Sequence, residues 1–273
     1  MNYFETLEKK YTPETRLSYS SLKHFYKSPL DFLKYINKDF SWTDPMILGS
    51  LTDCLLLEPQ KFDEKFINIP NIDRRTKAGK EAWAELQKNI GDKIPVKKDL
   101  LDKANFMKEA LEQNPMSKML LNNTTEVQKH IEFKYKGLTI RGILDGFGEF
   151  DGKPFIFDLK TTSESDPKSW YRSIIKYMYH LQAAIYQAGI FNEGFIMPDF
   201  YHIIVETAAP YKVSVVKFCP ETLKAGKKIL KKIVSDFNYC IDNDLWSEGY
   251  EFNDPNINEV SLPEWYLNIL NNE

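Results

Sequence analysis

The sequence predicts an α/β fold (mixed α+β) in which a central mixed β-sheet is flanked by helices. Apolar residues recur at helical spacing through about residue 113, whereas between residues 131 and 157 they alternate with a period of two or run together. The predicted order is helices, three strands, a helix, two strands and a helix, which is not a regular alternation of strand and helix. We therefore expect one sheet with helices packed against it.

The N-terminal half is predicted to be helical. Ser18 is a favourable N-cap for a first helix that carries Leu22 and Phe25 and ends near Pro29. The same periodicity predicts four further helices, over residues 32–36, 45–58, 78–90 and 97–113.

Three consecutive strands are predicted next. Ile131, Phe133 and Tyr135 alternate with polar residues before a turn at Lys136-Gly137. The second strand spans residues 138–150, and a turn at Asp151-Gly152 leads into a short apolar strand at residues 155–157. The remaining predicted elements are a helix from Pro167 to about residue 191, strands over residues 200–206 and 211–218, and a helix over residues 221–242.

The composition predicts one globular domain over residues 1–273. Apolar residues make up 42% of the chain and aromatic residues 14%, too many large side chains for a disordered protein. No repeat or low-complexity linker interrupts the chain. We divide the domain into a helical N-terminal part (1–122), a sheet-containing core (123–242) and an acidic C-terminal tail (243–273).

The net charge of −3 excludes a protein held to nucleic acid by bulk charge alone. This total conceals an uneven distribution, because residues 241–273 contain eight acidic and no basic side chains. Residues 1–240 therefore hold 36 basic and 31 acidic side chains, a balance of +5. A mildly basic body is compatible with a protein that focuses positive charge on one channel.

Three scattered cysteines, with no C-x-x-C pair, exclude a disulfide framework and a four-thiolate zinc or iron–sulfur site. No segment approaches the roughly 18 apolar residues needed to span a bilayer, and residues 1–10 lack the apolar stretch of a signal peptide. We therefore expect a cytoplasmic protein without a membrane partner.

The candidate catalytic residues are Asp145 on the second predicted strand and Asp158 and Lys160 at the end of the third. Residues two apart in a strand project to the same face, so Asp158 and Lys160 should lie together, with Asp145 across the turn. Two hard carboxylates suit Mg²⁺, and a lysine beside it can position water and offset charge on phosphorus. A D-x-K tripeptide alone favours a surface salt bridge over a catalytic site, so the surrounding sequence has to decide between them.

Asp145 followed by D-L-K-T-T at residues 158–162 resembles the core of the PD-(D/E)xK nucleases, in their RecB-like branch. The segment from Tyr179 to Tyr186 resembles the Q-x-x-x-Y motif of that branch. The resemblance implies a restriction-endonuclease-like core in which Gln182 and Tyr186, four residues apart on one helical face, support the site.

Earlier segments resemble the exodeoxyribonuclease VIII (RecE) nuclease domain, and with the later motifs they cover roughly residues 18–191. They are S-Y-S-S-L-K at residues 18–23, L-G-S-L-T-D-C-L-L-L-E-P at residues 48–59 and R-R-T-K-A-G-K at residues 74–80. The last contributes a candidate DNA-binding patch, for which a solvated helix start is an equally good interpretation. Its basic residues are Arg74, Arg75, Lys77 and Lys80.

One residue departs from the family pattern. The resemblance places a metal-ligating histidine where this chain has Asp53. Aspartate is a harder ligand that also suits Mg²⁺, so the metal ligands implied are Asp53, Asp145 and Asp158. A further acidic ligand is left open among four residues, Glu109, Glu112, Glu126 and Glu132.

The resemblance implies a Mg²⁺-dependent exonuclease, with Mn²⁺ as a possible substitute, that digests linear double-stranded DNA from 5′ ends and leaves 3′ single strands. It also implies a homo-oligomeric ring at DNA ends, a RecT-like single-strand annealing protein as partner, and a role in phage or prophage recombination in a bacterial cytoplasm. Two alternatives are a RecB-like nuclease of other polarity, such as the CRISPR-associated members, and a DNA-end-binding protein that has lost turnover.

Overall fold

A mixed sheet of five strands forms the centre of the computed structural model, which describes residues 7, 10–70, 72, 75–257 and 259–264. The strands lie side by side in chain order. All neighbours are antiparallel except β5 and β6, which are parallel and are joined by helices. The strands are β3 (Thr124–Tyr135), β4 (Leu138–Phe150), β5 (Lys153–Thr162), β6 (Asp199–Glu206) and β7 (Val213–Lys217).

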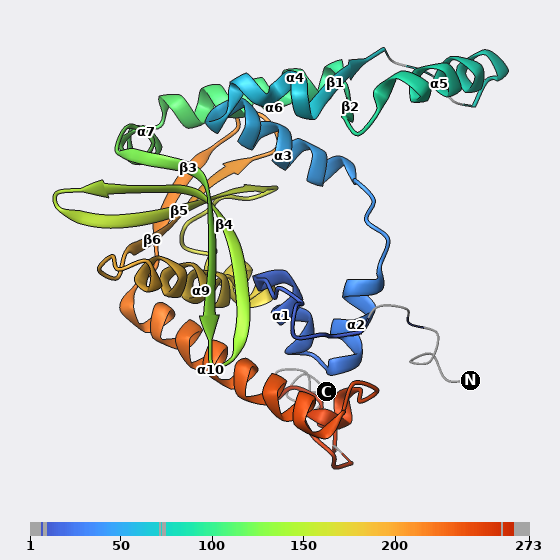
Figure 1. Cartoon of the computed structure of the whole chain (residues 1–273). Coiled ribbons are helices and arrows are strands. Elements are labelled where there is room, and N and C mark those ends of the chain that lie inside the picture. The colour runs from blue at the N-terminus through green and yellow to red at the C-terminus, as the bar shows by residue number, and fades with distance from the viewer. Residues whose placement is uncertain (1–6, 8–9, 71, 73–74, 258, 265–273) are drawn as a thin grey trace, which may run out of the picture.

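Helices cover both faces of this sheet (Figure 1). One face packs against α1 (Tyr19–Phe25), α2 (Pro29–Asn37), α9 (Tyr179–Asn192) and α10 (Pro220–Asn243). The other face packs against α3 (Asp44–Leu57), α6 (Lys98–Gln113) and α7 (Pro115–Asn122). The mixed sheet flanked by helices that the sequence predicts is therefore confirmed.

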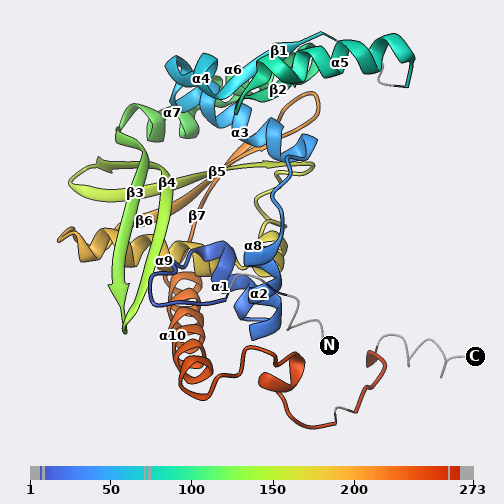
Figure 2. The same cartoon turned by 45° about the vertical axis from the view of Figure 1, so that its right-hand side comes forward.

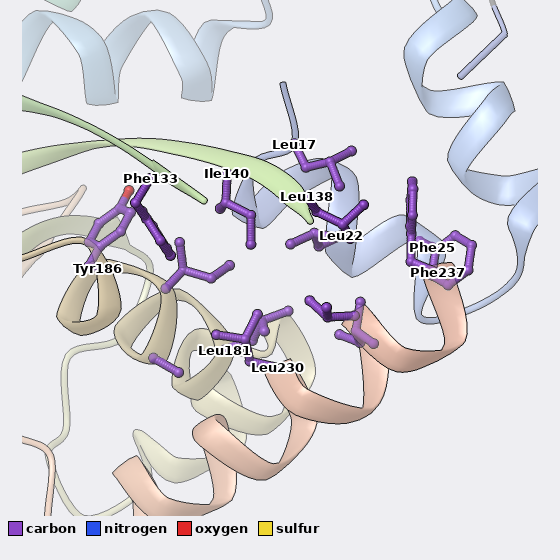
Figure 3. Close-up of a cluster of buried hydrophobic side chains, with 14 of the residues drawn as sticks. Leu17, Leu22, Phe25, Phe133, Leu138, Ile140, Leu181, Tyr186, Leu230 and Phe237 are labelled. Carbon is purple, nitrogen blue, oxygen red and sulfur yellow. The ribbon is translucent and has the colours of Figure 1, made fainter. Parts of the chain in front are cut away.

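Two hydrophobic clusters, one on each face, fix the sheet between these layers. Alternate residues of β5 divide between them: Ile156 packs toward α9 and α10, while Phe155 and Phe157 pack toward α3 and α6. Figure 3 shows the first cluster, in which Leu181 of α9 and Leu230 of α10 meet beneath the β3–β4 hairpin. Since Asp158 and Lys160 continue the alternation of Ile156, they face α9.

A small parallel sheet lies at the edge of the second cluster, to which Phe66, Ile94 and Val96 belong. It pairs β1 (Phe66–Ile69), which follows the short α4 (Phe62–Lys65), with β2 (Ile94–Lys97), and α5 (Lys77–Ile90) connects the two strands. Figure 1 and Figure 2 both show α5 projecting from one end of the molecule, away from the five-stranded sheet. The sequence did not predict these strands, because four-residue segments show too little alternation to be recognised.

Other element boundaries also differ from the prediction. The helix expected from Pro167 to about residue 191 is two helices, α8 (Tyr171–Tyr177) and α9, because Met178 adopts a left-handed backbone with a φ of 58°. β3 begins at Thr124, seven residues early, since its largely exposed first half lacks apolar alternation. β5 extends to Thr162, so Asp158 lies inside the strand and not at its end. The sequence also missed α7, although Asn114 and Pro115 are a typical N-cap and first residue.

The packing of α10 on α9 depends on Gly226. A Cβ atom at this position would lie 1.9 Å from the carbonyl oxygen of His180, a backbone atom that cannot move aside. We expect Gly226→Ala to lower the free energy of unfolding by about 1–3 kcal/mol or more. Urea denaturation measures this, with the exposed Lys228→Ala of the same helix as a control expected to change it by less than about 0.5 kcal/mol. Equal stability of both variants would contradict this account of the α9–α10 contact.

Within the described part of the chain, no helix combines the length and apolar character that a membrane span requires.

Candidate active site

The register of β4 and β5 brings the two predicted catalytic aspartates together. Gly146 pairs with Phe157 at the last position of the β4–β5 ladder, so Asp145 and Asp158 are the next residues of the two strands. Beyond this pair β4 separates from β5, and the Asp145 carboxylate accepts a hydrogen bond from the backbone N–H of Leu159 at 2.7 Å. The Gln128 amide of β3 donates to its other oxygen at 3.5 Å.

Asp158 and Lys160 form an ion pair on the α9 side of β5. Their side chains are only 5% and 17% exposed, which excludes the surface salt bridge that a D-x-K tripeptide also permits. The Lys160 ammonium also lies 4.6 Å from the centre of the Tyr179 ring, a cation–π contact. These contacts hold the ammonium beside the carboxylates.

Gln182 and Tyr186 of α9 extend this network. The Gln182 amide donates hydrogen bonds to the Asp158 carboxylate at 2.7 Å and to the Tyr186 hydroxyl at 3.1 Å. Space for the Tyr186 ring exists because Gly142 of β4 has no side chain, and a Cβ atom there would approach the ring to 2.8 Å. The two residues of the Q-x-x-x-Y motif therefore hold the Asp158 carboxylate in position.

Asp53 reaches the same group of carboxylates from α3, on the opposite face of the sheet. The middle of α3 packs against the end of β5, where a Cβ atom on Gly49 would lie 3.5 Å from the Thr161 hydroxyl. The charge of Asp53 interacts with those of Asp145 and Asp158. Three carboxylates from three elements thus share one region with the Lys160 ammonium.

The electrostatics of this group favour a cation. Loss of solvation raises the pKa of Asp145 to about 7, with the charge of Asp158 as the second cause. Loss of solvation and the charges of Asp145 and Asp158 raise the pKa of Asp53 well above its usual range. Burial lowers the pKa of Lys160, but the charges of Asp158 and its neighbours outweigh burial, so the pKa is raised and the ammonium stays charged. The group contains three carboxyl groups and only one ammonium, so its acidic side chains outnumber its basic ones.

These residues fit a hard divalent cation. Mg²⁺ takes oxygen ligands, keeps several waters and needs only one or two protein carboxylates, which Asp145 and Asp158 supply. The Gln182 side-chain oxygen is buried beside them without a hydrogen-bond partner in the described structure. Among the described residues, no three histidine, cysteine or carboxylate side chains lie close enough to enclose one ion. Asp53 as a third ligand therefore stays a prediction.

The candidate DNA-binding patch lies away from this site. Arg74 falls outside the described residues, and Arg75, Lys77 and Lys80 are exposed at the start of α5. Because α5 projects away from the five-stranded sheet, the structure does not bring them to the carboxylates (Figure 2).

The four glutamates left open as further ligands also lie elsewhere. Glu132 pairs with Arg16 at 2.7 Å, Glu126 with Lys129 at 3.0 Å and Glu112 with Lys108 at 3.3 Å. Glu109 is exposed on α6.

Three residues near the site were not identified from the sequence. Tyr179 lies one helical turn before Gln182, which is the signal that could have identified it. Tyr19 donates a hydrogen bond to the Tyr177 carbonyl, and its pKa is raised by burial and by the charges of Tyr179 and Asp158. Lys23 of α1 has a pKa lowered by burial and by the charge of Lys160. No pattern in the sequence indicates that α1 reaches β5.

The fold and this arrangement together define a PD-(D/E)xK-like protein: a mixed sheet whose central strands present two aspartates and a lysine, backed by a helix with Q-x-x-x-Y. The family model for a PDDEXK-like domain of unknown function (DUF3799) matches residues 18–251. The chain belongs to this family.

One solved structure supports the fold. A protein from Eubacterium rectale, provisionally described as an exonuclease, is 13% identical, with a TM-score of 0.56 and coverage of 96% of this chain and 97% of that one. A second structure, SSO0001, is 16% identical over 70% of this chain and 86% of that one, but its TM-score of 0.30 is too low to carry an argument. No curated protein sequence matches the chain.

Proposed function

We propose that this protein is a Mg²⁺-dependent deoxyribonuclease that hydrolyses phosphodiester bonds, with Mn²⁺ as a possible substitute. The observation that carries the proposal is the grouping of Asp145, Asp158 and Lys160, with the lysine ion-paired and largely buried. Membership of a PDDEXK-like family supports the reaction class, since divalent metal ions are general in such nucleases.

In this proposal, Asp145 and Asp158 would hold the ion, and the Asp53 carboxylate would add negative charge to the same region. When bound, the ion polarises the scissile phosphodiester and makes water a better nucleophile. Lys160, a cation beside Asp158, orients the attacking water and offsets negative charge that develops on the phosphoryl oxygens. Gln182 and Tyr186 keep the Asp158 carboxylate in position.

We further propose that the substrate is the end of linear double-stranded DNA, digested from the 5′ strand to leave a 3′ single strand for recombination. The provisional description of the E. rectale protein as an exonuclease and the resemblance to exodeoxyribonuclease VIII support this mode. A ring of identical subunits and a RecT-like annealing protein, in a phage or prophage setting, follow from the same resemblance.

Three DNA substrates test the proposal: linear duplex labelled at the 5′ end, linear duplex labelled at the 3′ end, and a closed circle, each with Mg²⁺ and with EDTA. We expect Mg²⁺-dependent release of the 5′ label first and no loss of the circle. Early release of the 3′ label would indicate a nuclease of other polarity, and degradation of the circle would exclude an obligate exonuclease. Binding to DNA ends without release of label would indicate a DNA-end-binding protein that has lost turnover.

Asp53 is expected to set the metal preference. Asp53→His replaces a hard oxygen ligand by an imidazole nitrogen, which suits Mn²⁺ better than Mg²⁺. The ratio of activity in Mn²⁺ to activity in Mg²⁺ should rise by about tenfold, within the range of ligand-environment effects. Asp53→Ala, which supplies no ligand, is the control and should lower activity with both ions. An unchanged ratio in Asp53→His would contradict a role of Asp53 at the metal.

A further inference from the structure

A polar cavity of about 370 Å³ lies beside the catalytic group. Its walls are the end of β5 with the loop that follows and the outer side of α8. The side chains that line it include hydroxyls and two cations, namely Thr162, Ser163, Ser169, Arg172, Ser173 and Lys176. This volume is in the lower range of small-molecule sites and is comparable with one nucleotide unit.

The cavity and the catalytic group share a wall. Tyr179 lines the cavity, and the same ring contacts the Lys160 ammonium at 4.6 Å. Thr161, the next residue of β5 after Lys160, also lines it. The cavity is therefore within reach of a nucleic acid strand bound at Lys160.

The loop between β5 and α8 is held at both ends, so the cavity is preformed. The Ser165 backbone N–H donates to the Glu206 carboxylate at 3.0 Å, and the Ser214 hydroxyl donates to the Ser165 carbonyl at 2.6 Å. At the other end, the buried Trp170 indole donates to His202 at 3.0 Å. A rigid wall of hydroxyls binds a ligand with little loss of conformational entropy.

Arg172 and Lys176 supply the charge. They lie four residues apart on α8, and neither forms a salt bridge within the part of the chain that the structure describes. Arg172 contacts the Tyr171 hydroxyl at 3.4 Å, and Lys176 lies 5.1 Å from the centre of the Tyr177 ring. One acid, the exposed Glu164, also lines the cavity. Two cations against one acid leave the cavity with a positive balance.

We propose that this cavity binds a phosphate group of the DNA strand next to the scissile bond, with Arg172 and Lys176 as its cationic contacts and the hydroxyls as hydrogen-bond donors. The proposal rests on the proposed nuclease function. The phosphate is either the monoester at a strand terminus or the neighbouring backbone diester, which present the same oxygens to these side chains.

Binding without divalent metal tests the cavity separately from catalysis. Fluorescence anisotropy of a labelled short duplex in EDTA is measured for wild type, for Arg172→Ala/Lys176→Ala, and for Lys168→Ala, an exposed lysine of the same loop that does not line the cavity. We expect the double variant to bind about tenfold or more weakly, and Lys168→Ala to bind as wild type. The slope of log Kd against log salt should fall by about one to two, since two phosphate-neutralising charges are removed.

Duplexes with 5′-phosphate, 3′-phosphate and hydroxyl ends separate the two sources of the phosphate. If the cavity binds a terminal monoester, the double variant should lose no affinity for duplexes with hydroxyl ends. If it binds a backbone diester, the double variant should lose the same affinity for every duplex. Equal Kd and equal salt slope for wild type and double variant on all duplexes would overturn the proposal, as would an equal loss in Lys168→Ala. Should the alanine variant not fold by circular dichroism, Arg172→Gln/Lys176→Gln replaces it with the same criteria.

The two proposals fail in different ways. If wild type releases label with Mg²⁺ but the double variant binds DNA as tightly as wild type, the phosphate-site proposal is wrong and the nuclease proposal is retained. If wild type never releases label but binding falls in the double variant, the nuclease is wrong and the cavity is a DNA-phosphate site of a binding protein.

Discussion

Lys160→Ala is expected to lower the rate of Mg²⁺-dependent DNA hydrolysis by about a thousandfold, the loss typical of removing one preorganised charge at a reacting oxygen. The Lys160 ammonium is the one cation ion-paired with Asp158 in the described structure, and it lies against the Tyr179 ring. Removing it takes away the group that orients water and offsets charge on phosphorus. Release of label from linear duplex in Mg²⁺ measures the rate.

The matched control is Lys153→Ala, an exposed lysine at the other end of the same strand. It should retain nearly full activity. Because Lys160→Ala also leaves the carboxylates without their counter-charge, its folding is checked in Mg²⁺ by circular dichroism. Full activity in a folded Lys160→Ala protein would rule out the assigned role.

Asp145→Asn is expected to abolish hydrolysis and, without metal at pH 8, to raise the thermal midpoint of unfolding. The pKa of Asp145 is raised to about 7 by loss of solvation and by Asp158, whereas an unfolded aspartate titrates near 3.9. The folded protein therefore holds this proton more tightly. The stability contributed by the group is complete below about pH 4 and is lost as the pH rises through about 7.

At pH 8 the ionised Asp145 opposes folding, and asparagine removes that charge while its side-chain oxygen can still accept the Leu159 hydrogen bond. Thermal unfolding of both proteins in EDTA, at pH 5 and pH 8, measures the effect, which should be larger at pH 8. Mg²⁺ should stabilise wild type more than the variant, since a ligand stabilises the state that binds it.

Asp151→Asn makes the same chemical change in the exposed β4–β5 turn and should leave the thermal midpoint nearly unchanged. A lower midpoint for Asp145→Asn than for wild type at pH 8 would show that the carboxylate is needed for folding, contrary to this account. The expected gain in stability from a change that removes activity is typical of residues selected for function.

Local sequence determined most of the secondary structure of the core. Several predicted features depend only on interactions within a few residues, and the structure contains the corresponding elements. They are the Ser18 cap, the strand alternation of residues 131–135 and the turns at residues 136–137 and 151–152. The spacing of Asp158 and Lys160, and that of Gln182 and Tyr186, likewise placed each pair on one face, because strand and helix geometry alone fixes those relations.

The relations between elements required the tertiary structure. The β4–β5 register, the approach of Asp53 from the opposite face and the position of Tyr186 over Gly142 depend on packing between segments distant in sequence. The same applies to the basic residues at the start of α5, which the sequence offered as a candidate DNA-binding patch and which lie away from the carboxylates. The sequence by itself determined which side chains are candidates for the chemistry, because residue type and spacing are local. Only the three-dimensional packing decided which of them meet and how deeply they are buried.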